Sequence, residues 1–263
     1  MSERIRKNLL LFFCIAFIWS WGLWLPKVLL NFGIECLDIW LYLSDFAVFG
    51  PLIAAIIVTY IRLGKNQLRL LLIKGIRTNF RTIWLIPAIF LMPLFALLSF
   101  LLIIPIEGLY ILNNALPWQL LMSFTLEIFL LGGPLGEEYG WRGFALVRLE
   151  FKWNALISSL ILGLVIALWQ LPLYFIQGTI QQYITIFPNI VIVILSSIIY
   201  TWLYNNTDKS VLITMILHLS TIVASAIFPY WSSTVGSWIF CGCIFTSAII
   251  ILWKYGIKNL KSE

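Results

Sequence analysis

The chain has 263 residues, of which 62% are hydrophobic and 11% are charged. Soluble domains carry about 25% charged residues, so these charges are too few to cover a water-soluble globule. The abundance of aliphatic and aromatic residues equally excludes an intrinsically disordered chain. The composition therefore predicts an all-α, polytopic membrane protein. We expect residues 1–263 to form a single transmembrane domain, with no room for a sizeable soluble one.

The apolar runs predict eight membrane-spanning helices, because each span needs about 20 apolar residues. A basic stretch precedes the first run, and no small-residue cleavage site follows it, so we expect a retained span rather than a signal peptide. The pattern of the second run allows a start as early as Ile39, and Gly132-Gly-Pro134 predicts a break in the fourth. The expected spans are residues 9–30, 46–61, 82–103, 123–147, 154–176, 184–204, 210–229 and 236–253.

The basic residues fall between the apolar runs and form no patch on a soluble face, which argues against nucleic acid as a partner. With these spans, 16 of the 17 basic residues lie on one side of the bilayer, and Lys27 lies on the other. The positive-inside rule makes the basic side cytoplasmic, and both termini belong to it. The partner that the composition itself implies is the lipid bilayer.

Residues 62–81 join the second and third spans and mix basic residues with leucines in an amphipathic pattern. We expect a cytoplasmic connector that lies on the membrane and is held there by anionic lipid. A binding site for a protein partner is the alternative that the same pattern allows.

Charges in the fourth span need an explanation, because a charged group inside the bilayer is costly. Glu138 and Arg142 are spaced i, i+4 and can pair on one helix face. Glu137 points about 100° away from Glu138. Its unpaired carboxylate, in a low-dielectric site, can act as a general base near neutral pH. A network that only fixes helix packing is the alternative, but ionisable groups inside a membrane are functional by default.

Two further polar residues lie near the predicted midplane. His218, the single histidine of the chain, lies in the seventh span at the depth of the glutamates, so we expect it to share their cavity. Gln170 lies in the fifth span, and a buried amide needs hydrogen-bond partners. Packing roles are the alternatives, and for Gln170 taken alone interhelical hydrogen bonding is the better explanation.

Three segments carry a resemblance to a known family. Residues 133–144 read Gly-Pro-Leu-Gly-Glu-Glu-Tyr-Gly-Trp-Arg-Gly-Phe. This segment resembles the Glu-Glu-x-x-x-Arg signature of the CPBP intramembrane proteases, also called the Abi or CAAX protease family. Leu168-Trp-Gln-Leu-Pro172 resembles the context of the second family signature, and Leu217-His-Leu-Ser-Thr-Ile222 occupies the place of the third. The resemblance covers about residues 46–225.

The resemblance implies a CPBP-like helical bundle that hydrolyses peptide bonds of membrane-associated peptides or proteins. It implies that Glu137 activates water, that Glu138 and Arg142 support the site, and that His218 is the surviving member of a histidine pair. It also favours an integral protein of a bacterial plasma membrane.

The sequence departs from the family pattern at two positions. Gln170 stands where the second signature has histidine, and Ile222 stands where the third has asparagine. A glutamine amide can donate a hydrogen bond to an oxyanion, but it does not titrate near pH 7 and is a poor zinc ligand. A two-histidine zinc site is impossible in a chain with one histidine. The sequence leaves the use of any metal or other cofactor open.

Three functions are compatible with these residues. The first is an intramembrane endopeptidase, of full or reduced activity. The second is a pseudoprotease that binds a peptide without cutting it, as a bacteriocin-immunity-like protein would. A transporter that uses the buried charges as a proton relay ranks behind both, because no inverted repeat or pair of broken helices is present. Prenylated proteins, bacteriocins and signalling peptides are all open as substrates or ligands.

Overall fold

The computed structural model describes residues 3–108, 128–131 and 133–261. Helices make up most of these residues, and no strand occurs within the described ranges, which confirms the predicted all-α class. The long helices are α1 (Glu3–Asn31), α3 (Gly50–Leu63), α5 (Leu85–Glu107), α9 (Ala155–Trp169), α10 (Ile186–Asn206), α11 (Val211–Ile227) and α12 (Thr234–Tyr255). The shorter elements are α2 (Asp38–Leu43), η1 (Ser44–Phe49), α4 (Lys65–Ile73), η2 (Lys74–Ile76), η3 (Thr82–Trp84), α7 (Pro134–Glu138), η5 (Tyr139–Leu146), α8 (Val147–Leu149), η6 (Leu171–Phe175), η7 (Ile180–Tyr183) and η8 (Tyr230–Ser232).

Six of the eight predicted spans are helical segments long and apolar enough to cross a membrane. They are Glu3–Asn31, Asp38–Leu63, Thr82–Glu107, Ala155–Phe175, Ile186–Asn206 and Thr234–Tyr255. The second begins at Asp38, close to the early start that its sequence allowed. The predicted seventh span is α11, an apolar helix of 17 residues.

The predicted fourth span is broken, as its Gly-Gly-Pro sequence indicates. Gly133 has a φ of 118°, a backbone conformation that residues with a side chain rarely adopt. Pro134 begins α7 directly after it. From Pro134 a continuous helical segment runs through α7, η5 and α8 to Leu149, with π-helical hydrogen bonding in η5. The beginning of this predicted span, residues 123–127, lies outside the described residues.

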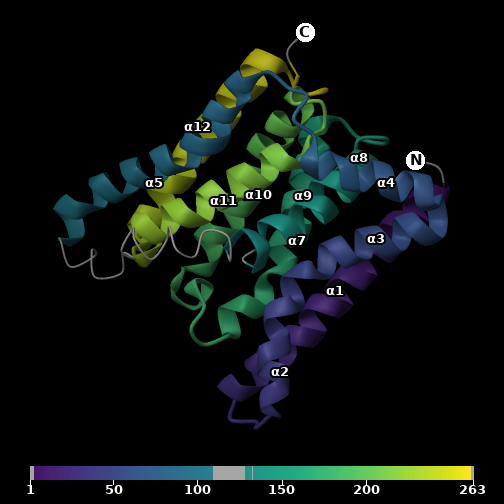
Figure 1. Ribbon diagram of the computed structural model, residues 1–263. Coiled ribbons are helices and arrows are strands. Elements are labelled where there is room, and N and C mark those ends of the chain that lie inside the picture. The colour runs from purple at the N-terminus through teal and green to yellow at the C-terminus, as the bar shows by residue number, and fades with distance from the viewer. Residues whose placement is uncertain (1–2, 109–127, 132, 262–263) are drawn as a thin grey trace.

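The segment α7–η5–α8, called the signature helix below, begins near the centre of the molecule at α7 and ends at α8 toward one side (Figure 1). It contacts α3 on one side and α11, α9 and α10 on the other. Small residues allow this close packing: a Cβ atom on Gly136 would lie 2.5 Å from the Val48 carbonyl oxygen, and one on Gly140 would lie 2.4 Å from Pro51 Cβ. Glycine lets the signature helix approach the backbones of η1 and α3 closely, as at other helix interfaces in membranes.

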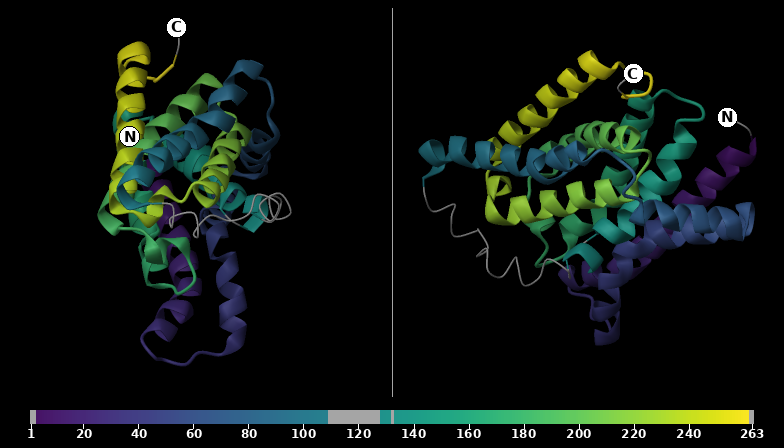
Figure 2. Two further views of the ribbon diagram at one scale, coloured as in Figure 1. Left: turned by 90° about the vertical axis from the view of Figure 1, so that its left-hand side faces the viewer. Right: turned by 45° about the horizontal axis from the view of Figure 1, so that its top comes forward.

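Within the connector of residues 62–81, Lys65–Ile73 form the helix α4, which is followed by η2, and its place on the membrane stays a prediction. Leu71 is buried, whereas Leu70 and Leu72 are exposed. The Tyr139 hydroxyl donates a hydrogen bond to the Leu72 carbonyl oxygen at 2.9 Å, so that α4 is fastened to the signature helix. The beginning of α1, the end of α12, α4 and α8 lie toward one side of the molecule, and α2 lies at the opposite end (Figures 1 and 2).

Candidate active site

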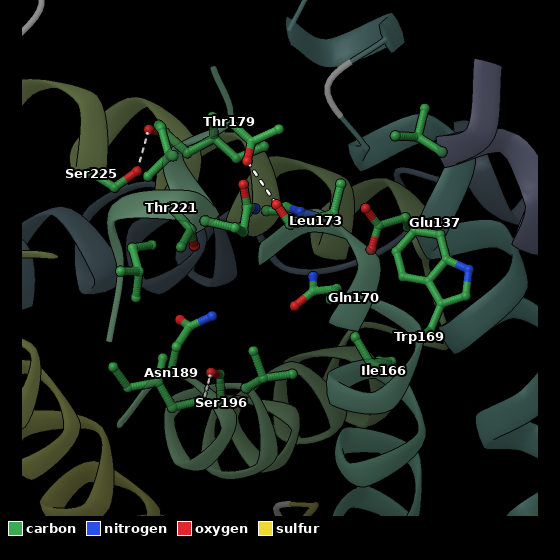
Figure 3. A pocket seen from close by; sticks show the side chains of 18 of the residues that line it. Glu137, Ile166, Trp169, Gln170, Leu173, Thr179, Asn189, Ser196, Thr221 and Ser225 are labelled. Carbon is green, nitrogen blue, oxygen red and sulfur yellow. Dashed lines mark hydrogen bonds between the residues drawn. The ribbon is translucent and has the colours of Figure 1, made fainter. Parts of the chain in front are cut away.

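A cavity of about 710 Å³ brings together all the polar residues that the sequence singles out. Its walls come mainly from η1, the signature helix, α9 with the following loop, α10 and α11, and α1, α5, η8 and α12 complete the lining. Figure 3 shows the cavity from close by. The predicted residues on its wall are Glu137, Glu138, Arg142, Gln170, His218 and Ile222. Three segments separated in sequence therefore meet at one site, which is what a shared chemical role requires.

Glu138 is the centre of a buried hydrogen-bond network. Its side chain is fully buried, and its Oε1 atom accepts from Arg142 Nη1 and lies 3.0 Å from His218 Nδ1. The i, i+4 pair predicted from the sequence is thus confirmed. Since a carboxylate only accepts, His218 Nδ1 carries the proton in this contact. When the ring is neutral, a proton on Nδ1 leaves Nε2 unprotonated, so that His218 Nε2 can accept a hydrogen bond.

Arg142 is held on several sides, which suits a positioning residue. It is 5% exposed, and its guanidinium lies 4.2 Å from the centre of the Tyr200 ring. Its Nη2 atom is also 3.5 Å from Ser197 Oγ. The Tyr200 ring in turn meets the His218 ring edge-on, with 6.2 Å between ring centroids. Burial, the ion pair and the aromatic ring together fix the cation beside Glu138.

Glu137 lies outside this network. It is 6% exposed and forms no salt bridge within the part of the chain that the structure describes. A Cβ atom on Gly133 would lie 2.5 Å from Glu137 Oε1 and 3.5 Å from His218 Cε1. The Glu137 carboxylate and the outer edge of the His218 ring therefore converge on the space beside Gly133. That space exists because residue 133 has no side chain.

Gln170 and Ile222 are in the cavity at the positions where the sequence departs from the family pattern. Gln170 is the C-cap residue that directly follows α9, and Pro172 lies in η6 after it. Its side chain points into the cavity, between Glu137 and Asn189 (Figure 3). Ile222 lies one turn after His218 on α11 and lines the same cavity. This wall therefore offers an amide and a hydrocarbon side chain rather than a second histidine and an asparagine.

Two features of the cavity were not predicted from the sequence. Asn189, near the start of α10, lines the cavity and donates from Nδ2 to the Tyr174 hydroxyl at 2.5 Å. Its sequence signal is weak, because a single asparagine at the beginning of an apolar helix usually caps or packs. Lys27, which the charge pattern set apart from the other basic residues, also lines the cavity and pairs with Asp45 at 2.9 Å.

The donor atoms in the cavity do not fit a catalytic zinc ion. Such a site uses three protein ligands and keeps one position open. Glu138 Oε1 and His218 Nδ1 are engaged with each other, which leaves the Glu137 carboxylate, the buried Glu138 Oε2 atom and His218 Nε2 as the remaining candidate ligands. Within residues 3–108, 128–131 and 133–261, no three His, Cys, Asp or Glu side chains are grouped to hold a metal. We therefore derive no catalytic step through a metal ion.

Comparison with known proteins agrees with the geometry. Residues 116–224 match the family described as type II CAAX prenyl endopeptidase Rce1-like, and this range contains every predicted site residue. The resemblance to the CPBP family is confirmed. The chain is also 29% identical over 238 residues to a protein named CAAX prenyl protease 2 from Methanococcus maripaludis. That alignment covers 83% of this chain and 84% of the relative, and supports membership in the CAAX prenyl endopeptidase-like group.

Proposed function

We propose that this protein is an intramembrane endopeptidase that hydrolyses a peptide bond in the central cavity, with residues 46–225 as its catalytic core. The observation that carries the proposal is the convergence of Glu137 and His218 beside Gly133, next to a Glu138–Arg142 pair that orients the histidine. A carboxylate outside the ion-pair network and a fixed imidazole are the groups that acid–base hydrolysis needs.

The reaction balances with these side chains and one water molecule. Glu137 takes a proton from the water as the water oxygen attacks the peptide carbonyl carbon, and His218 Nε2 accepts a hydrogen bond from the second water hydrogen, which stays on the attacking oxygen. The Gln170 amide donates a hydrogen bond to the oxygen that becomes negative. When the carbon–nitrogen bond breaks, the proton on Glu137 passes to the leaving amine, and the products are a carboxylic acid and an amine.

The departures at Gln170 and Ile222 favour a slow enzyme. An amide in place of histidine cannot exchange a proton, and isoleucine in place of asparagine provides no hydrogen-bond donor. Losing one acid–base or oxyanion group lowers the rate by about 10² to 10⁴. We therefore expect hydrolysis that is detectable but weak, with the glutamates retained because they still serve the reaction.

The substrate is a membrane-associated peptide or protein. The cavity walls mix polar groups with apolar side chains such as Met92, Phe240 and Trp231, which suits a substrate with an apolar part. Because the relative is named a CAAX prenyl protease, a peptide with a prenylated C-terminal cysteine motif is the first substrate to test. We further propose that both termini face the cytoplasm, which rests on the distribution of basic residues.

The test is cleavage of such a peptide by the purified full chain in detergent. Glu137→Gln should lower the rate by at least about 10², since the general base is lost. The matched control is Asp45→Asn, which changes a carboxylate of the same cavity that is paired with Lys27. Equal cleavage by the parent and Glu137→Gln would remove Glu137 from the mechanism.

A pseudoprotease is the second candidate function, favoured by the hydrocarbon side chain of Ile222 at a position where the family has asparagine. In that case the parent binds peptide without cutting it. The double substitution Gln170→His with Ile222→Asn then creates cleavage that the parent lacks. If the parent already cleaves and loses cleavage on Glu137→Gln, the pseudoprotease is rejected.

A further inference from the structure

A second cavity, of about 510 Å³, lies on the side of the molecule that carries α4 and α8. It is formed by the first turns of α1, the end of α3, α4 with η2, and the last turns of the signature helix. It shares no lining residue with the active-site cavity, so the proposed catalysis does not explain it. Its lining residues include both cations and apolar side chains, and a role for them does not depend on peptide hydrolysis in the other cavity.

Three cations line this cavity, and none of its lining residues is acidic. The cations are Arg4, Lys74 and Arg148. Within the described residues none of them forms a salt bridge, and their hydrogen bonds go to neutral oxygen atoms. These bonds join Arg4 Nη2 to the Arg62 carbonyl at 2.7 Å, Lys74 Nζ to the Tyr204 hydroxyl at 3.2 Å, and Arg148 Nη1 to the Phe144 carbonyl at 2.7 Å. Because each group has more donors than these bonds use, the cavity concentrates positive charge and spare N–H donors.

Lys74 lies in a buried and electropositive environment. Burial, together with the nearby charges of Lys209, Arg148 and Arg77, lowers the pKa of Lys74 to about 8. Glu150 is the one neighbour that acts in the opposite direction. A negatively charged group in the cavity would offset this repulsion and keep the ammonium protonated.

Thr59 provides an independent observation on the same wall. Its side chain is 3% exposed, and its Oγ1 atom has no hydrogen-bond partner among the described residues. A threonine inside a helix commonly donates to the carbonyl four residues before it, and buried hydroxyl groups are almost always paired. An oxygen atom of a bound ligand is the partner that the cavity can supply.

Apolar side chains line the cavity next to the cations. Leu70 is 55% exposed and Phe151 is 67% exposed, and both line the cavity. Leu63 and Ile5 extend this apolar lining at the ends of α3 and α1. A free phosphate ion would leave these side chains without a function, whereas the acyl chains of a lipid would cover them.

We propose that this cavity binds an anionic phospholipid, with the headgroup phosphate between Lys74, Arg148 and the Thr59 hydroxyl. The acyl chains lie over Leu70 and Phe151. Because Gly143 and Val147 also line the cavity, the lipid contacts the back of the helix that carries Glu137 and Glu138. It thereby joins α4 to the signature helix at a point additional to the Tyr139–Leu72 hydrogen bond.

The experiment titrates short-chain phosphatidylglycerol into the full chain in detergent and measures affinity and the thermal midpoint. Phosphatidylcholine of the same chain length and inorganic phosphate are titrated alongside. Phosphatidylglycerol should bind at least about tenfold more tightly than either and raise the midpoint, because it alone combines net negative charge with acyl chains. Lys74→Gln and Arg148→Gln should each weaken its binding by about tenfold or more.

Two variants distinguish specific binding in this cavity from a general attraction of anionic lipid to a basic protein. Lys65→Gln removes the same charge from the same connector, but Lys65 does not line the cavity, so the affinity should change less than about twofold. Thr59→Val should weaken lipid binding severalfold without lowering the midpoint of lipid-free protein, since its hydroxyl has no partner within the protein.

Four results would overturn the proposal. Equal affinity for the two lipids would remove the charge selectivity, and equal affinity for inorganic phosphate would make this a free-anion site. If Lys65→Gln weakens binding as much as Lys74→Gln, the attraction is diffuse. A lower midpoint of lipid-free Thr59→Val would make the hydroxyl a structural group.

Discussion

Replacing Glu138 by glutamine separates the positioning role of this residue from the catalytic role proposed for Glu137. Glu138 is fully buried and is the carboxylate partner of both Arg142 and His218, each at 3.0 Å. Glutamine has nearly the same shape and keeps one acceptor oxygen, so the substitution removes charge with little change in packing. The same change at Glu137 alters a carboxylate that is outside the ion-pair network.

The expected magnitude follows from what remains around Arg142. Without the carboxylate, the guanidinium keeps the Ser197 hydroxyl at 3.5 Å and the face of the Tyr200 ring at 4.2 Å, neither of which carries a negative charge. Removing one partner of a buried pair costs about 3–5 kcal/mol, and the retained acceptor oxygen puts this case near the lower limit. With about 2–4 °C per kcal/mol, Glu138→Gln should lower the thermal midpoint by about 6–12 °C.

The assay is thermal unfolding of each purified variant in one detergent, with cleavage measured in parallel. Both substitutions should lower cleavage, but Glu137→Gln should leave the midpoint unchanged or raise it. Asp45→Asn is the control for an exposed pair: its side chain is 61% exposed, so its loss should cost at most about 1 kcal/mol. Combining Glu138→Gln with Arg142→Met should recover stability relative to Glu138→Gln, because replacing both buried charges is far less costly than removing one.

The assignment of roles fails if Glu137→Gln lowers the midpoint as much as Glu138→Gln does. It also fails if the thermal midpoint of Glu138→Gln equals that of the parent, because the charge of Arg142 would then be stabilised without the Glu138 carboxylate. A double variant less stable than Glu138→Gln would show that Arg142 is held by groups other than Glu138.

Three further predictions concern backbone and charge. Gly133→Ala should abolish cleavage, because the new Cβ would lie 2.5 Å from Glu137 Oε1 at a φ of 118°; Gly22→Ala, with open space around it, should leave cleavage intact. Gly140→Ala should lower the yield and thermal midpoint of folded protein, because its Cβ would lie 2.4 Å from Pro51 Cβ and 2.5 Å from the Pro51 carbonyl carbon and oxygen; a midpoint like that of the parent would contradict this packing. The affinity for anionic lipid should fall as pH rises above about 8, where Lys74 loses its proton, and Lys74→Arg should extend binding to higher pH; a parent whose affinity is constant from pH 7 to 10 would exclude Lys74 from the site.

The membrane class and most of the spans could be predicted from the sequence because their cause is local. A run of apolar residues is long enough to cross a bilayer or it is not, whatever surrounds it. The break at Gly133 and the Glu138–Arg142 pair are equally local, since a Gly-Pro step and an i, i+4 spacing act within one helix. The predicted edges of the spans are less accurate, because a helix continues into the interface beyond its apolar run: α1 begins at Glu3 rather than at residue 9.

The composition of the two cavities was decided by the tertiary structure. His218 lies 80 residues from Glu138 in sequence, and nothing in either segment indicates that the ring bonds Glu138 and only approaches Glu137. Asn189 and Lys27 lie in the active-site cavity because of how distant helices pack together, which their own segments do not indicate. The second cavity likewise takes its residues from four separate segments. Hydropathy determines that a helix lies in the membrane, but it does not determine how the helix is rotated against its neighbours. That rotation depends on small residues such as Gly136 and Gly140, and only the packed structure reveals which surfaces they bring together.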